Sequence, residues 1–167
     1  MMQRALLFLG SLWLSALLPL QGRAQGMWTA DAIRLAQAGR LEEAEYKVEA
    51  ALESDEAQDA LTWYVSAFIQ KELFVQREGR FPDSQARVKA VDHAMRVTEL
   101  NPNDDVSGRN EALLTFLADT HLEDARDAMP QSGPEEATAA EAHFARYVAI
   151  RLHLNPQWSP IPDEVLF

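Results

Sequence analysis

Residues 28–52 read WTADAIRLAQAGRLEEAEYKVEAAL, and this stretch decides the fold class. Its first half predicts a helix from an N-cap at Thr29 to Ala38, followed by Gly39 in the left-handed conformation that ends many helices. Its second half carries apolar residues at helical spacing on one stripe: Leu41, Ala44, Val48, Ala51 and Leu52. The stretch therefore predicts two helices that face each other across a short turn.

The rest of the chain after Ala24 repeats this pattern, with no strand-length alternation of apolar and polar residues. Four more helices are predicted over about 59–77, 83–100, 107–129 and 134–154, separated by Gly79 with Pro82, by the cluster 101–104 and by the loop 130–133. The predicted fold is all-α, with three antiparallel helix pairs of which the second and third are elongated.

Apolar residues also predict the buried faces of the later helices. The predicted face of the fourth helix comprises Val88, Val91, Met95 and Thr98, and that of the fifth comprises Leu113, Leu114, Leu117, Leu122 and Ala125. Three prolines follow residue 154, so residues 157–167 are predicted to form an extended tail over the last pair.

Two of the predicted helices end in the same tripeptide, Leu-Asn-Pro, at 100–102 and again at 154–156. Trp28 and Trp63 stand 35 residues apart, close to the roughly 34-residue period of tetratricopeptide repeats. Residues 39–44, GRLEEA, resemble the turn of that family, although Glu56 replaces its consensus proline. The chain from 28 to 156 thus resembles a divergent tetratricopeptide repeat protein of the exported bacterial type, with the match weakening from the first pair to the third.

This resemblance implies a right-handed solenoid over residues 25–156, whose first helices line a concave surface that binds peptides or proteins. A single pair cannot bury its apolar face, and about three stacked pairs are needed for stability. The third pair is either a true repeat or a capping element.

Carried onto this chain, the concave positions of the second repeat are Leu61, Tyr64, Phe68, Lys71 and Glu72. Leu61, Tyr64, Phe68 and Lys71 share one helix face, where two aromatic rings and a cation suit an apolar side chain and a carboxylate. These five are the candidate partner-binding residues. The alternative is that the aromatic stripe packs in the core.

The histidines do not form a recognisable catalytic or metal-binding motif. His121 has no second histidine three or four positions away, as a helical zinc pair requires. His93, His143 and His153 are interpreted as solvated or favoured by a helix dipole. The sequence predicts no enzyme, no metal site and no cofactor.

The N-terminal segment, residues 1–24, has the pattern of a secretory signal peptide. Its apolar run, ALLFLGSLWLSALLPL at 5–20, is shorter than the roughly 20 residues of a membrane-spanning helix. Small residues at Gly22 and Ala24 predict cleavage after Ala24, which gives a periplasmic or secreted protein without stable membrane insertion. The alternative is an uncleaved membrane anchor.

The chain is acidic and has no cysteine. Its 15 Lys and Arg against 26 Asp and Glu give a net charge of -11, so a surface for nucleic acid is not expected. Disulfides and thiolate chemistry are excluded because cysteine is absent.

These observations predict a protein-interaction or scaffold module with a protein or peptide partner. Two other classes stay open: an acidic cation-binding protein or small helical enzyme, and a structural homo-oligomer with an empty groove. The sequence does not determine the partner or the oligomeric state.

Overall fold

The computed structural model describes residues 26–100, 102–129 and 134–160, and this part of the chain is all-α. The helices are α1 (Met27–Gln37), α2 (Leu41–Leu52), α3 (Ala60–Gln76), α4 (Gln85–Glu99), α5 (Asp104–Ala128) and α6 (Pro134–Leu154), with a short 3-10 helix, η2 (Asp55–Gln58), between α2 and α3. The predicted signal peptide and the end of the tail lie outside the described residues. None of the described helices is long and apolar enough to cross a membrane.

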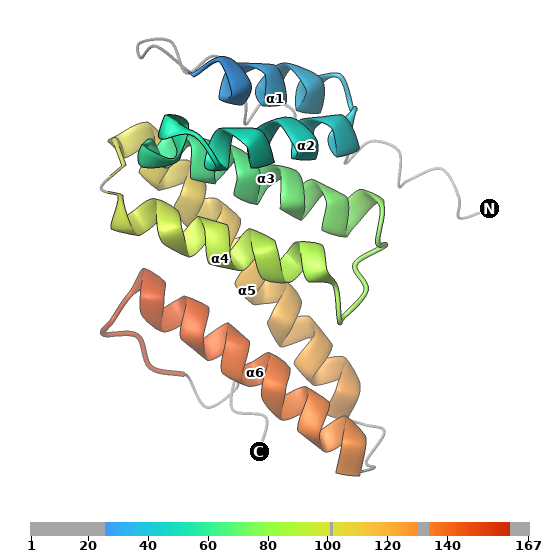
Figure 1. Cartoon of the computed structure of the whole chain (residues 1–167). Helices are drawn as coiled ribbons and strands as arrows, with labels where there is room; N and C mark the ends of the chain where they lie inside the picture. Colours follow the sequence, from blue (N-terminus) through green and yellow to red (C-terminus); the bar gives the residue numbers. More distant parts are fainter. Residues whose placement is uncertain (1–25, 101, 130–133, 161–167) are drawn as a thin grey trace, which may run out of the picture.

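The helices pack as sequential antiparallel pairs, α1 with α2, α3 with α4 and α5 with α6 (Figure 1). Each pair also contacts the next, through α2 on α3 and α4 on α5, and the first helices of successive pairs touch one another. The second and third pairs are longer than the first, as predicted: α5 has 25 residues where α1 has 11.

Two helix starts differ from the prediction. Helix α1 begins at Met27 with Gly26 as its N-cap, so Thr29 is not the cap but lies inside the first turn. Helix α5 begins at Asp104, not at Ser107, because the Asn103 side chain accepts a hydrogen bond from the Val106 amide at 3.0 Å. The Asn-Asp cluster that was expected only to stop α4 therefore also starts α5.

The predicted helix-ending glycines are confirmed. Gly39 after α1 has φ of 74° and Gly79 after α3 has φ of 60°. This left-handed region is accessible to glycine at low cost, which is why each turn falls where the sequence places a glycine.

Helix α3 occupies the centre of the structure. Of its 17 residues, 13 are buried, and they lie on all sides of the helix. A helix that is apolar all round belongs in the interior of a fold. Here α2, α4 and α5 all pack against it, and Figure 1 shows α5 running behind α3 and α4.

The predicted face of α5 is confirmed, and that of α4 is partly wrong. All five predicted core residues of α5 are buried, whereas on α4 Val88 and Thr98 are exposed. The buried face of α4 consists mainly of small residues, Ala86, Ala90, Ala94 and Val97, together with Val91. Alanines allow two helices to approach closely, so the buried face of α4 was determined by the small size of its side chains rather than by their hydrophobicity.

The described part of the tail remains in contact with the last pair. Trp158 is half-buried, and its ring meets Tyr147 of α6 edge-on at 5.6 Å between centroids. This contact fixes residues 155–160 against α6.

Candidate functional site

The five predicted partner-binding residues lie in the core of the structure. Leu61, Tyr64, Phe68 and Lys71 are each less than 8% exposed, and the Glu72 side chain is 12% exposed. Burial raises the pKa of Tyr64 to about 12. These side chains therefore pack inside the protein, which was the alternative interpretation, and they do not form an open stripe along α3.

Lys71 illustrates why the stripe is closed. Its ammonium lies 4.5 Å from the centroid of the Phe68 ring and 5.8 Å from that of Phe116 on α5, and it forms an ion pair with Glu72. Such contacts hold a cation over aromatic faces at low exposure. The charge that was expected to meet a partner's carboxylate is thus enclosed by the protein's own side chains.

An open pocket of about 460 Å³ lies instead where the N-terminal ends of α1, α3 and α5 meet. We call it the acidic pocket. Its lining comes from five places in the chain: Gly26 and Thr29 at the start of α1; Asp55, Glu56 and Gln58 of η2; Asp59, Ala60, Leu61 and Thr62 at the start of α3; Leu100 and Pro102 after α4; and Asn103 and Val106 at the start of α5. Leu61 is the one predicted site residue that reaches this pocket.

Glu56 is the central polar residue of the acidic pocket. Its carboxylate accepts hydrogen bonds from the amides of Trp28 at 3.1 Å and Thr29 at 2.9 Å, and from the Thr29 hydroxyl at 2.7 Å. Glu56 thereby caps α1, although it lies 28 and 27 positions after the two residues whose amides it binds. Burial raises the pKa of Glu56, but the hydrogen bonds from Thr29 and Trp28 outweigh it, and the pKa is lowered.

The direction of the neighbouring hydrogen bonds follows from this charge. Thr29 and Thr62 are both buried, and their hydroxyl oxygens lie 2.9 Å apart. Because an ionised carboxylate only accepts, the Thr29 hydroxyl donates to Glu56 and must accept from Thr62. The hydrogen bonds from Thr62 to Thr29 and from Thr29 to Glu56 therefore run in one direction, and they link α3, α1 and η2.

Gly26 makes room for this arrangement. A Cβ built on Gly26 would lie 1.9 Å from the Glu56 carboxyl carbon. Any other residue at position 26 would force the Glu56 carboxylate to move away from its position on α1. The glycine is therefore favoured by close approach and not by its backbone angles, which are φ -57° and ψ 152°.

Side chains of the chain itself also cap the other two helices at the pocket. Asp59 accepts from the Leu61 amide at 3.0 Å at the start of α3, and Asn103 caps α5. Helix N-termini attract anions through amides that lack partners. Here the caps satisfy some of those amides, and carboxylates remain on the pocket wall.

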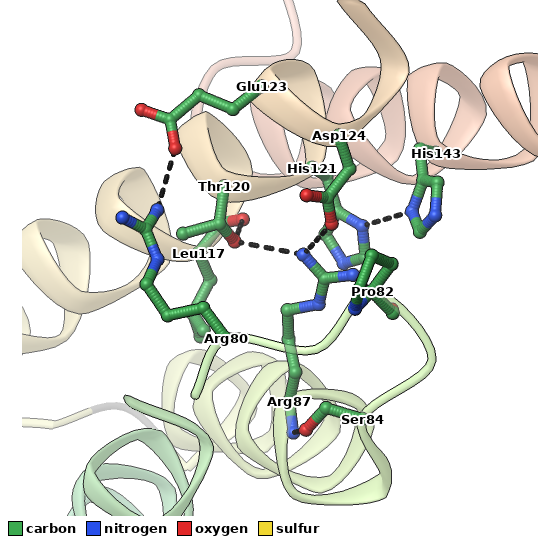
Figure 2. A network of polar contacts seen from close by, with 10 residues as sticks. All are labelled: Arg80, Pro82, Ser84, Arg87, Leu117, Thr120, His121, Glu123, Asp124 and His143. Carbon is green, nitrogen blue, oxygen red and sulfur yellow. Dashed lines mark hydrogen bonds and ion pairs between the residues drawn. The ribbon is translucent and has the colours of Figure 1, made fainter. Parts of the chain in front are cut away.

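A second polar cluster joins α4, α5 and α6 (Figure 2). Arg87 of α4 is 1% exposed; its guanidinium meets Asp124 of α5 at 2.6 Å and Thr120 at 3.4 Å, and donates to the Pro82 carbonyl. It also lies 5.0 Å from the Phe74 ring centroid. A buried ion pair of this kind specifies which surfaces meet, and breaking it by removing one partner costs about 3–5 kcal/mol.

Next to this ion pair, His121 of α5 meets His143 of α6, with their Nδ1 atoms 3.2 Å apart (Figure 2). Burial first, and then Arg87, His143 and Arg146, lower the pKa of His121 to about 3. Burial and Arg87 also lower the pKa of His143, against the opposite effect of Asp124 and Asp83. One ring must donate and the other accept, so only one of the two Nδ1 atoms carries a proton.

The other two histidines also have partners. His93 lies 2.9 Å from the Ser66 hydroxyl and edge-on to Trp63, and burial lowers its pKa. His153 is exposed, as expected, and meets Thr98 at 2.8 Å. His93 and His143 are therefore only partly solvated, because other helices supply each with a partner that sequence spacing does not reveal.

The acidic pocket was not predicted from the sequence. The signal that it offered was Glu56, which stands where the repeat consensus has a proline. In the described residues no group of three or more His, Asp or Glu is placed to hold a metal ion. Comparison with protein-family models, with curated proteins and with solved structures gives no match.

Proposed function

We propose that this protein is an exported, non-catalytic binding module that holds a segment of a protein partner in the acidic pocket. The observation that carries the proposal is the pocket itself, an opening of about 460 Å³ lined by both apolar and polar residues. Binding sites are typically concave and combine apolar lining with a few fixed polar groups.

The helix arrangement supports a right-handed solenoid of the tetratricopeptide type as the scaffold. In such a stack each pair packs on the next in chain order, and the contacts α1 to α3, α2 to α3, α3 to α5 and α4 to α5 fit this order. The partner-binding region is shifted from the middle of α3 to its N-terminal end, because α5 covers the middle.

The rigidity of the pocket wall supports binding without rearrangement. Glu56, Thr29 and Thr62 are linked by hydrogen bonds, and the Trp63 indole donates to the Ala57 carbonyl at 2.8 Å, which fixes η2 on α3. A preformed wall reduces the ordering entropy that binding costs.

Site-specific photo-cross-linking in the cells that make the protein tests this function. A photoreactive amino acid replaces Gln58, an exposed residue that lines the pocket, in one variant and Gln85, which is also exposed and lies at the start of α4, in the matched control. We expect a discrete protein adduct from position 58 and not from position 85. The same adduct at both positions, or none at either, would contradict the proposal.

The N-terminus of the protein isolated from those cells tests export. Mass spectrometry should find a chain that begins at Gln25. A chain that retains residues 1–24 would contradict cleavage and favour the anchor.

A further inference from the structure

We propose that the acidic pocket binds the side chain of a lysine or arginine on the partner. This inference rests on the proposed function and adds the chemistry that the site recognises. The cation would lie among Asp55, Glu56 and Asp59, with its aliphatic stem along the apolar lining residues.

Charge complementarity is the first argument. Three carboxylates, those of Asp55, Glu56 and Asp59, line the pocket, and among the described residues that line it there is no Lys, Arg or His. The chain as a whole has a net charge of -11, which favours the approach of basic partners.

The state of the helix ends is the second argument. Three helix N-termini would ordinarily make the region attractive to an anion. Here Glu56, Asp59 and Asn103 already accept from amides of α1, α3 and α5. Glu56 accepts three hydrogen bonds, and a carboxylate has about four lone-pair positions, so it still has room for a donor from a partner.

The apolar lining of the pocket is the third argument, and it distinguishes a side chain from a bare ion. Leu61 and Val106, which are buried, and Leu100, which is half-buried, all line the pocket. Lysine and arginine bury their methylene stems on apolar surface while the charged head meets polar groups. A metal ion would leave this apolar surface uncovered.

The test uses short capped peptides and the chain from Gln25 to Phe167. The probe is acetyl-Leu-Lys-Leu-amide, compared with peptides that carry arginine, norleucine or glutamate at the centre. Titration is followed by amide chemical shifts in the ¹⁵N-labelled protein. We expect shifts at Gly26, Thr29 and Thr62 with lysine and arginine, and at least tenfold weaker binding of the norleucine peptide.

Two variants separate the pocket charge from the net charge. Asp55→Asn removes an exposed carboxylate at the pocket and should weaken lysine binding about threefold, whereas Asp127→Asn, at the far end of α5, should leave it unchanged. Binding should also weaken as salt is raised from 50 to 300 mM.

Several results would overturn the inference. Equal affinity for norleucine and lysine, preference for glutamate, or shifts at residues outside the pocket would each do so. So would lysine binding that appears only after the N-terminal amine of the protein is acetylated, because that amine would then be the pocket's own occupant.

The two proposals fail in different ways. If cross-linking from position 58 identifies a partner whose contacting segment is neutral or acidic, the cation inference is wrong and the binding module stands. If the lysine peptide binds in the pocket but no protein cross-links there, the cation site stands and the proposed function is wrong.

Discussion

Glu56 and Gly26 act as one unit, although 30 positions separate them in the sequence. The carboxylate of Glu56 occupies the space that a side chain at position 26 would fill, and from there it reaches the amides of Trp28 and Thr29. A helix of 11 residues is only marginally stable in isolation, so a long-range cap of this kind helps to define where α1 starts.

The first prediction concerns this unit. Glu56→Ala should lower the free energy of unfolding by about 2 kcal/mol, because it leaves two amides and the Thr29 hydroxyl without their acceptor. Gly26→Ala should cost a similar amount in the parent, because the new methyl group displaces the Glu56 carboxylate. Urea unfolding measures both.

The double variant is the decisive measurement. In the Glu56→Ala background, Gly26→Ala should cost almost nothing, since the atom it would strike is gone. Additive costs in the double variant would show that the two residues act independently.

At the scale of elements, α4, α5 and α6 are joined through polar groups as well as apolar ones. Arg87 reaches Asp124, and beside them His121 and His143 bring α5 and α6 together. Burial, and then Arg87 from α4 and His143 and Arg146 from α6, lower the pKa of His121. This junction therefore disfavours a second proton on the His121 ring.

The second prediction is an acid-sensitive stability. Because the pKa of His121 falls from 6.5 to about 3 on folding, the unfolded state binds a proton below pH 6.5 that the folded state does not. The unfolding free energy should therefore fall by up to about 1.4 kcal/mol per pH unit for this residue as the pH drops from 7 to 5. Glu56, whose pKa is lowered from 4.5, stays ionised over this range.

His121→Gln should reduce the pH dependence of the unfolding free energy by the contribution of about one bound proton. The exposed control, His153→Gln, should keep the slope of the parent protein. Urea unfolding at pH 7, 6 and 5 measures all three proteins. Identical slopes for the parent and His121→Gln would show that His121 is protonated in the folded state.

At the scale of the whole molecule, the third pair completes the core of the second. Helix α5 contacts both α3 and α4, and it supplies Phe116 over Lys71. The stripe of Leu61, Tyr64, Phe68 and Lys71 on α3 is therefore buried inside the protein. In the described part of the chain, the acidic pocket lies at the helix ends, and of this covered stripe only Leu61 lines it.

The third prediction compares two tyrosines. Tyr64→Ala should destabilise the protein by about 3–5 kcal/mol, because Tyr64 is 2% exposed and its removal leaves a cavity between α3 and its neighbours. Tyr46→Ala, at a tyrosine that is 69% exposed, should change stability by about 0.5 kcal/mol or less. Thermal and urea unfolding measure both. Equal, small effects would place Tyr64 on an open surface after all.

The sequence by itself determined the all-α fold, the pairing of neighbouring helices and the glycine-ended turns. These features depend on residues within a few positions of one another: the apolar stripe from Leu41 to Ala51 fixes a helix face, and Gly39 and Gly79 fix turns. The burial of α3 was left open at this level, because its aromatic stripe fitted either a binding surface or the core.

Only the tertiary structure decided which candidate side chains are accessible. Tyr64 and Phe68 are enclosed because α5 crosses them, and His121 gains a histidine partner 22 residues away in the sequence. The acidic pocket likewise joins Gly26, Glu56 and Asn103, which no local pattern connects. The physical reason is that burial and long-range hydrogen bonds depend on how helices cross in space, whereas sequence spacing reports only the face of a single helix.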